Sequence, residues 1–154
     1  IIVEEGLKMR EIECAVLGND DPSASLPGEY IIKDKAKAFL DYQEKYSATG
    51  NNEFVVPAPV SAELASKIQQ MAIAAFKAID GSGLARVDFF LRSDTGSLLI
   101  NEINTMPGLT EASGYPKMWA GTGLAFRDVL DQLIELAEQR FDDRARNQTS
   151  RVAD

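Results

Sequence analysis

The sequence predicts an α+β fold in which helices cover one face of a mainly antiparallel sheet. Two β-rich runs, Leu84 to Arg92 and Ser97 to Asn104, flank Asp94-Thr95-Gly96 and indicate a hairpin. Helical patterns lie before and after this hairpin, and short strand-like runs fill the first third of the chain. The 154 residues are enough for one domain with a single hydrophobic core.

Short apolar runs in the first third predict four strands, at Ile1 to Glu5, Glu11 to Gly18, Glu29 to Lys33 and Glu53 to Val56. Turn-forming residues separate the second strand from the third, and Pro57 stops the fourth because proline has no N–H to donate to a sheet. The segment from Asp34 to Asn52 has no clean period. It predicts a partly helical loop of the type that closes over binding sites.

Two helical patterns flank the hairpin. Ser61 is placed to cap the first helix and Gly81 to end it. The apolar stripe of this helix comprises Leu64, Ile68, Met71, Ala75 and Ile79. After a short helical piece around Lys117 to Ala120, the last helix is expected from about Ala125 to Phe141, with inward residues Phe126, Val129, Leu130, Leu133, Ile134 and Ala137. The domain is therefore expected at residues 1–141, and the polar residues 142–154 are predicted to be a frayed tail.

The hairpin determines which charged residues share a face of the sheet. A three-residue loop pairs Ser93 with Ser97, and this fixes the partners farther along the antiparallel ladder. These partners are Arg92 with Leu98, Asp88 with Glu102 and Arg86 with Asn104. Since side chains alternate along a strand, these residues share one face. The other face is expected to pack on a helix through Ala85, Val87, Phe89, Leu91, Leu99 and Ile103.

Asp88 and Glu102 would then be like charges in direct opposition, which costs up to about 1 kcal/mol. Flanked by Arg86 and Asn104, such a pair favours a bound cation, and its oxygen ligands suit Mg²⁺ shared with substrate phosphates. Two alternatives remain open from the residues alone. The carboxylates also suit a solvated sheet face, and a two-residue loop would slip the register and separate them.

The composition excludes several classes of site. Asp and Glu number 24 against 16 Lys and Arg, so the net charge of −8 argues against a nucleic-acid binder. With no histidine and one cysteine, the chain offers no disulfide, no Cys/His zinc site and no histidine base, and Cys14 is expected to be a small buried residue. No apolar run approaches the ~18 residues of a membrane span. The chain begins without methionine inside a predicted strand, which favours a fragment whose preceding part has been removed.

Five polar residues outside the hairpin have two interpretations each. Glu4, Glu5 and Glu11 suit either a ligand site or an ordinary surface. Lys45 and Tyr46, in the long loop, suit either a mobile binding loop or an exposed charge beside a packing aromatic ring.

Two glycine motifs are similarly ambiguous. Gly81-Ser82-Gly83 looks like part of a phosphate loop, but Arg86 occupies the position of the third glycine, so a helix C-cap is favoured. Gly108 after Pro107 fits either a turn whose N–H groups face an anion or a plain type II turn.

Three motifs, NEINTMPGLT followed by Ser113, GLARVDFFL and EEGLKMREIECAVLG, together resemble the C-terminal half of the D-alanine–D-alanine ligase family of the ATP-grasp superfamily. The resemblance runs from about Ile1 to Phe141, and its motifs are specific to this ligase family. It implies the ATP-grasp C-terminal subdomain and the ATP-dependent ligation of two D-alanines to D-alanyl-D-alanine through an acyl phosphate. Peptidoglycan precursor synthesis, and hence cell wall biogenesis and cell shape, would be the process served. ATP and two Mg²⁺ ions, or Mn²⁺ as a substitute, would be the cofactors.

The resemblance assigns the polar hairpin residues to phosphate chemistry. Asp88, Glu102 and Asn104 match the family's metal ligands, which clamp the ATP phosphates. Arg86 matches an arginine that neutralises the transferring phosphoryl group and the tetrahedral intermediate. The backbone N–H of Gly108 would help to form an oxyanion hole for that intermediate.

The resemblance also implies contacts to the substrates. The nucleotide would be bound by Glu4, Glu5, Leu7, Glu11 and Asn101, with the first three at the adenine hinge and Glu11 on the ribose. Ser113 would hold the carboxylate of the second D-alanine. Lys45 and Tyr46 match a pair in the loop that closes over the substrates. Relatives that make D-alanyl-D-lactate typically replace this tyrosine, so Tyr46 favours the dipeptide product.

Family members are usually cytoplasmic homodimers, which sets the expected location and oligomeric state. The expected partners are the D-alanine substrates, without nucleic acid or membrane. The family's N-terminal domain and its phosphate-binding lysines are absent from this sequence, so the chain is predicted to be inactive alone. The alternatives are another ATP-grasp carboxylate–amine ligase and a nucleotide-binding module without turnover.

Overall fold

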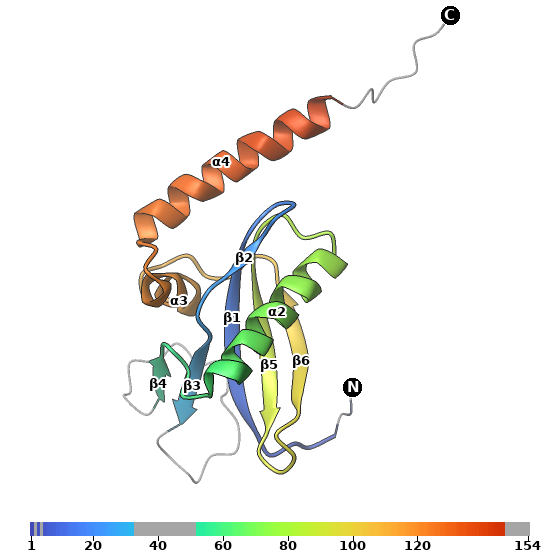
Figure 1. Cartoon of the computed structure of the whole chain (residues 1–154), viewed down its shortest axis with the longest axis vertical. Helices are drawn as coiled ribbons and strands as arrows, with labels where there is room; N and C mark the ends of the chain where they lie inside the picture. The colour runs from blue at the N-terminus through green and yellow to red at the C-terminus, as the bar shows by residue number, and fades with distance from the viewer. Residues whose placement is uncertain (2, 4, 33–51, 147–154) are drawn as a thin grey trace, which may run out of the picture.

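The computed structural model describes residues 1, 3, 5–32 and 52–146. In chain order, its elements are β1 (Met9–Gly18), β2 (Ser23–Ala24), β3 (Gly28–Ile32), β4 (Asn52–Val55), α2 (Ala62–Ala78), β5 (Gly83–Arg92), β6 (Leu98–Asn104), α3 (Gly114–Thr122) and α4 (Phe126–Ala145) (Figure 1). This mixture of an antiparallel sheet and helices confirms the predicted α+β class. The predicted loop from Asp34 to Asn52 lies almost entirely outside the described residues.

The sheet has the strand order β4-β3-β1-β5-β6, with β2 paired to β1, and its described pairs are antiparallel. The long central strands β1 and β5 pair over their whole length, from Met9 opposite Arg92 to Gly18 opposite Gly83. The register therefore places Glu13 directly opposite Asp88. The predicted strand at Ile1 to Glu5 is wrong, because the described residues among 1–8 have no regular structure and Ile1 and Val3 are exposed.

Helix α2 covers one face of the sheet, where it closes the larger core. The hydroxyl of Ser61 accepts a hydrogen bond from the N–H of Leu64 at 3.2 Å, which confirms the predicted cap. Ile68, Ala72, Ala75 and Phe76 are buried against β1 and β5, whereas Ile79 is 47% exposed and does not continue the stripe. Cys14 is fully buried in the same core, as predicted.

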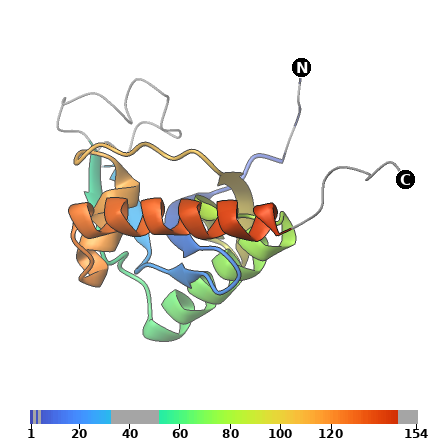
Figure 2. The same cartoon turned by 90° about the horizontal axis from the view of Figure 1, so that it is seen from above.

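A second core lies on the opposite face and corrects the prediction that helices cover only one face. There α3 and α4 pack over Ala15 and Leu17 of β1 through Tyr115, Met118, Trp119 and Val129. The Tyr115 hydroxyl donates to the carbonyl of Val16 at 2.9 Å and fixes α3 on the strand. Figure 2 shows α4 crossing one end of the molecule, with α2 on one side of the sheet and the loop after β6 on the other.

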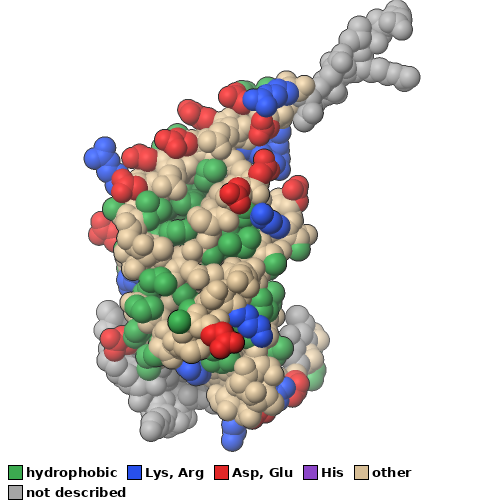
Figure 3. All heavy atoms as spheres, in the orientation of Figure 1, with side chains coloured by type: hydrophobic (Ala, Val, Ile, Leu, Met, Phe, Trp, Pro, Cys, Tyr) green, Lys and Arg blue, Asp and Glu red, His purple; other side chains and the backbone are tan. Residues whose placement is uncertain are grey.

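Helix α4 is less buried than its sequence predicts. Among its described residues Val129 alone is fully buried, and Leu133 and Leu136 pack partly on the second core. Leu130 and Ile134 were expected inward but are exposed, Ile134 by 61%. Acidic and basic side chains mark this end of the molecule in Figure 3. The helix reaches Ala145, so the first residues of the predicted tail are helical, and residues 147–154 lie outside the described part.

The hairpin register combines two departures from the predicted ladder. The N–H of Arg92 donates to the carbonyl of Ser97 at 2.9 Å, so the loop has four residues instead of three. Pairing near the turn is consequently shifted by one, with Leu91 opposite Leu98. An irregularity between Asp88 and Phe89 then restores the predicted register, because one extra residue of β6, Asn101, is inserted there as a bulge.

The bulge has two consequences for the faces of β6. Beyond it, Asp88 lies opposite Glu102 and Arg86 opposite Asn104, as predicted. On the side of the bulge nearer the turn, Leu98 instead of Leu99 packs against the larger core.

Within the described residues, no helix is long and apolar enough to cross a membrane.

Candidate functional site

The charged residues of β1, β5 and β6 gather at one end of the sheet face that α3 and α4 leave open. The other end of that face carries Ala15, Leu17 and Leu84, which the two helices cover. Because side chains alternate between the two faces of a strand, the open end of this face carries Glu11, Glu13, Arg86, Asp88, Glu102 and Asn104. A small cavity of about 80 Å³ is lined by Glu11, Glu13, Asp88, Asn101 and Glu102. Asp88 and Glu102 therefore face one common space.

Arg86 makes two hydrogen bonds to Asp88 through its guanidinium group. Its Nε and Nη2 donate to the two carboxylate oxygens of Asp88, each at 2.7 Å, and its Nε lies 3.5 Å from Glu13 Oε2. Burial by itself lowers the pKa of Arg86, but the hydrogen bonds to Asp88 and the charges of Glu13 and Asp88 raise it overall. The guanidinium is therefore a fixed positive charge in the site.

The donor set of the hairpin fits a hard divalent cation. Asp88 and Glu102 supply carboxylate oxygens from directly opposite positions, and Asn104 supplies an amide oxygen two residues along β6. Asn104 Oδ1 accepts a hydrogen bond from the N–H of Met106 at 3.1 Å, and its second lone pair leaves it able to bind an ion. No group of three or more His, Cys, Asp or Glu residues suited to a metal occurs in the part of the chain described. Oxygens of water or of a bound ligand would complete the coordination.

Gly108 and Ser113 lie together in the loop between β6 and α3. A Cβ atom on Gly108 would lie 2.8 Å from Ser113 Oγ, so a larger residue here would have to displace the Ser113 hydroxyl. Gly108 does not have a positive φ, which rules out the type II turn considered from the sequence. The hydroxyl of Ser113 contacts Thr110 Oγ1 at 2.8 Å and accepts from the N–H of Thr110 at 3.3 Å. The loop thus places the Ser113 hydroxyl beside the backbone of Gly108.

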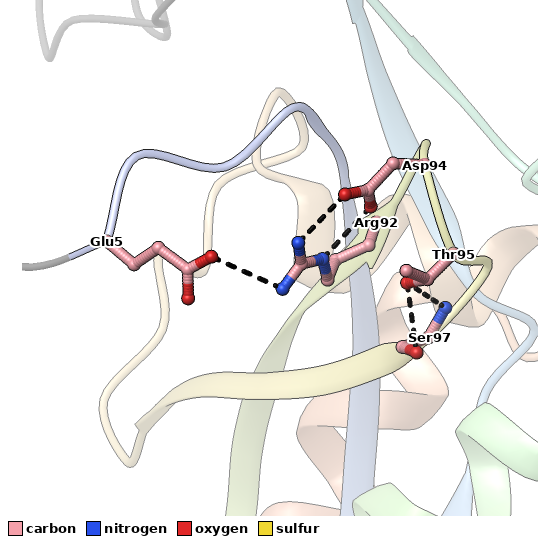
Figure 4. Close-up of polar contacts among 5 residues, drawn as sticks. All are labelled: Glu5, Arg92, Asp94, Thr95 and Ser97. Carbon is pink, nitrogen blue, oxygen red and sulfur yellow. Dashed lines mark hydrogen bonds and ion pairs between the residues drawn. The ribbon is translucent and has the colours of Figure 1, made fainter.

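The β5–β6 turn contacts the segment that precedes β1. Figure 4 shows Arg92 between Asp94 and Glu5, with Nη1 3.5 Å from Glu5 Oε1 and Nε 3.0 Å from Asp94 Oδ1. The hydrogen bonds from Arg92 lower the pKa of Asp94 to about 2. Thr95 and Ser97 close the turn through their hydroxyls, 3.0 Å apart. Leu7, within the segment before β1, is half-buried, while Glu4, Lys45 and Tyr46 lie outside the described residues.

Glu13 is a site residue that was not predicted from the sequence. It lies two positions from Glu11 on the same strand face and opposite Asp88, so its Oε2 comes within ion-pair distance of Arg86. The alternation Glu11-x-Glu13 within a strand of apolar residues was the available signal. It became visible only once β1 was paired with β5, because the partner strand of Glu13 lies some 70 residues away in the chain.

Comparison with known proteins identifies the family. A family model described as the D-ala D-ala ligase C-terminus matches residues 1–135. The chain belongs to this family. It is 48% identical over 151 residues to the D-alanine–D-alanine ligase of Ruminiclostridium cellulolyticum, covering 97% of this chain and 39% of that protein. The chain therefore spans about two fifths of the length of the curated relatives that it matches.

Solved structures agree with the sequence comparison. The D-alanine–D-alanine ligase from Coxiella burnetii matches with a TM-score of 0.76 and 44% identity, covering 92% of this chain and 35% of that one. The D-alanine–D-alanine ligase from Bacillus anthracis, crystallised in complex with ATP, matches with a TM-score of 0.72 and 27% identity, over 92% of this chain and 43% of that one. The charged sheet face thus belongs to a fold that binds ATP in a relative.

Proposed function

We propose that this chain is the C-terminal part of an ATP-dependent D-alanine–D-alanine ligase, and that its charged sheet face binds the nucleotide phosphates. The observation that carries the proposal is the register of the hairpin, which sets Asp88 opposite Glu102 and Arg86 opposite Asn104. Family membership over residues 1–135 supports the reaction class. The first D-alanine would be bound by the part of such a ligase that this chain does not include. That part would also make the remaining contacts to the ATP phosphates.

Asp88, Glu102 and Asn104 would hold two Mg²⁺ ions, with Mn²⁺ as a substitute. When bound, the ions would neutralise the phosphate charge and hold the phosphates in line for transfer. The chain's own contribution is to fix three oxygen donors on two paired strands, where the ladder of hydrogen bonds keeps their spacing.

Arg86 would neutralise negative charge during transfer of the phosphoryl group to the carboxylate of the first D-alanine. The amine of the second D-alanine then attacks the carbonyl carbon of the acyl phosphate, and phosphate leaves. The backbone N–H of Gly108 would donate to the oxygen that becomes negative in this step. Ser113 Oγ, beside Gly108, would donate to the carboxylate of the attacking D-alanine.

Binding of the nucleotide base and ribose completes the proposal. The contacts to base and ribose would come from Glu4, Glu5, Leu7 and Glu11, and Asn101 would also bind the nucleotide. Among these, Glu11 and Asn101 line the small cavity together with the proposed metal ligands. Lys45 and Tyr46 would close over the substrates and exclude water, which protects the acyl phosphate from hydrolysis. The whole ligase would act as a cytoplasmic homodimer that supplies the peptidoglycan precursor.

A chimaera tests the proposal. Residues 1–154 replace the matching part of the Ruminiclostridium cellulolyticum ligase, and ADP release is measured in a coupled assay with and without D-alanine. The proposal predicts D-alanine-dependent ADP release and D-alanyl-D-alanine as the product. It also predicts that the 154-residue chain alone shows no D-alanine-dependent ADP release.

Two outcomes would contradict this assignment. Turnover only with a different amino acid as acceptor would indicate another carboxylate–amine ligase. ATP binding without turnover, unaffected by Arg86→Ala, would indicate a nucleotide-binding module. The ligase proposal instead requires that Arg86→Ala abolish turnover and leave ATP binding in place, because Arg86 acts on the charge of the transition state.

A further inference from the structure

Glu13 is a buried carboxylate in the middle of the sheet. It is 2% exposed and lies on β1 between Asp88 of β5 and Gly28 of β3. Charged side chains are almost never buried to this extent unless they are paired, because removing a charge from water is costly. Glu13 meets this condition through Arg86, whose Nε lies 3.5 Å from its Oε2.

The contacts of Glu13 lead to two separate parts of the proposed site. On one side, its Oε2 is 3.5 Å from Nε of Arg86. On the other, a Cβ atom on Gly114 would lie 2.9 Å from the same Oε2, so the carboxylate is packed against the first residue of α3. The N-terminus of a helix favours negative charge, which makes this approach electrostatically favourable. Ser113 immediately precedes that residue.

The position of Glu13 matters most when Asp88 binds a cation. In the structure, Nε and Nη2 of Arg86 both donate hydrogen bonds to the carboxylate of Asp88. A divalent cation on Asp88 would repel the guanidinium and compete for the same oxygens. Glu13, on the neighbouring strand β1 with its Oε2 3.5 Å from Arg86 Nε, would then still offer the arginine a negatively charged partner.

We propose that Glu13 is a positioning residue that holds Arg86 and the start of α3 in one arrangement. It thereby couples the arginine that faces the phosphoryl group to Ser113, which faces the second D-alanine. This inference rests on the function proposed above and goes beyond it, since Glu13 would contact neither substrate nor metal. A merely structural carboxylate would stabilise the fold without affecting the chemical step.

The chain contains a matched control for Glu13. Glu29 is also a buried carboxylate of the sheet, 5% exposed, and accepts two hydrogen bonds from Arg10 at 2.7 and 2.6 Å. It lies opposite Ile12, which packs in the core under α2, so this pair occupies the other face of the sheet. Replacement of Glu29 removes a buried ion pair without altering the proposed site.

The kinetic test compares Glu13→Gln with Glu29→Gln in the chimaera. The proposal predicts that Glu13→Gln lowers kcat at least tenfold while the KM for ATP stays within threefold, because Arg86 remains present but is no longer held. Glu13→Asp keeps the charge and is expected to recover part of the rate. Glu29→Gln is expected to keep kcat within twofold even if it lowers the melting temperature. A kcat within twofold of wild type for Glu13→Gln would overturn the proposal.

An independent measurement avoids reliance on turnover. The Nε–H signal of Arg86 is recorded by ¹H–¹⁵N NMR in the 154-residue chain and identified by its loss in Arg86→Lys. The signal is expected to shift or to exchange faster with water in Glu13→Gln, and to stay unchanged in Glu29→Gln. An unchanged signal in Glu13→Gln would overturn the proposal. If the wild-type chimaera makes no D-alanyl-D-alanine, the proposed function fails, and this NMR comparison alone decides whether Glu13 holds Arg86.

Discussion

Substitution of Arg86 by lysine separates the charge of this residue from its geometry. The guanidinium donates two hydrogen bonds of 2.7 Å to Asp88 and lies 3.5 Å from Glu13. Lysine keeps the positive charge but offers a compact ammonium in place of a planar fork, so one of the two charge-assisted bonds to Asp88 is lost.

The size of the effect follows from the loss of that one bond. A hydrogen bond to a charged group contributes about 1.5–3 kcal/mol to stability. At about 2–4 °C per kcal/mol for a domain of this size, the melting temperature should fall by about 3–12 °C. The effect on kcat should exceed the effect on stability. Removing one preorganised donor to a developing negative charge lowers kcat by about 10²–10³.

The assay is steady-state ADP release by the chimaera, together with thermal unfolding of the same preparations. Arg10→Lys is the matched control, because Arg10 makes an equivalent two-armed contact with Glu29 on the other face of the sheet. Arg10→Lys should change the melting temperature and leave kcat unaltered. If Arg86→Lys and Arg10→Lys have the same effect on kcat, Arg86 has no special part in the reaction and the reasoning is refuted.

Three further predictions concern other residues. Gly108→Ala should raise the KM for D-alanine with little change in melting temperature, because its Cβ would meet Ser113 Oγ at 2.8 Å in an exposed loop; an unchanged KM would show that the two residues do not act together. Burial raises the pKa of the Cys14 thiol to about 12, so a thiol reagent at pH 8 should label Cys14 only after unfolding; labelling of the folded protein would contradict its burial. Hydrogen bonding from Arg92 lowers the pKa of Asp94 from 3.8 to about 2. The stability that this pair contributes should therefore be fully present above pH 3.8 and be lost as the pH falls through about 2. A carboxyl NMR titration of Asp94 with a midpoint near 3.8 would disprove the contact.

The sequence predicted the polar pairs of the hairpin correctly but for an incomplete reason. It assumed a three-residue loop and a regular ladder, whereas the loop has four residues and Asn101 is a bulge. The two deviations cancel at Asp88 and Glu102. Bulges depend on how a strand fits its neighbours in the whole sheet, so the local sequence pattern gave no sign of this one.

The packing of helices was predictable only in part. The stripe of α2 is buried because it meets the centre of the sheet, whereas α4 crosses one end of it and buries Val129 alone among the residues described there. Periodicity identifies an apolar face but not what covers it. Glu13 was missed for a similar reason, because its significance depends on Asp88 and Arg86, which only the β1–β5 pairing brings beside it.

The central claim is that Asp88 and Glu102 together bind the divalent ion that accompanies the nucleotide. Mn²⁺, which substitutes for Mg²⁺ and broadens nearby NMR signals, tests it directly when added with ATP to the ¹⁵N-labelled chain. Selective broadening is expected for backbone signals around Asp88 and Glu102, with those at the C-terminal end of α4, far from the sheet in Figure 1, unaffected. Broadening that avoids both Asp88 and Glu102, or that persists in the Asp88→Asn, Glu102→Gln double variant, would contradict the account.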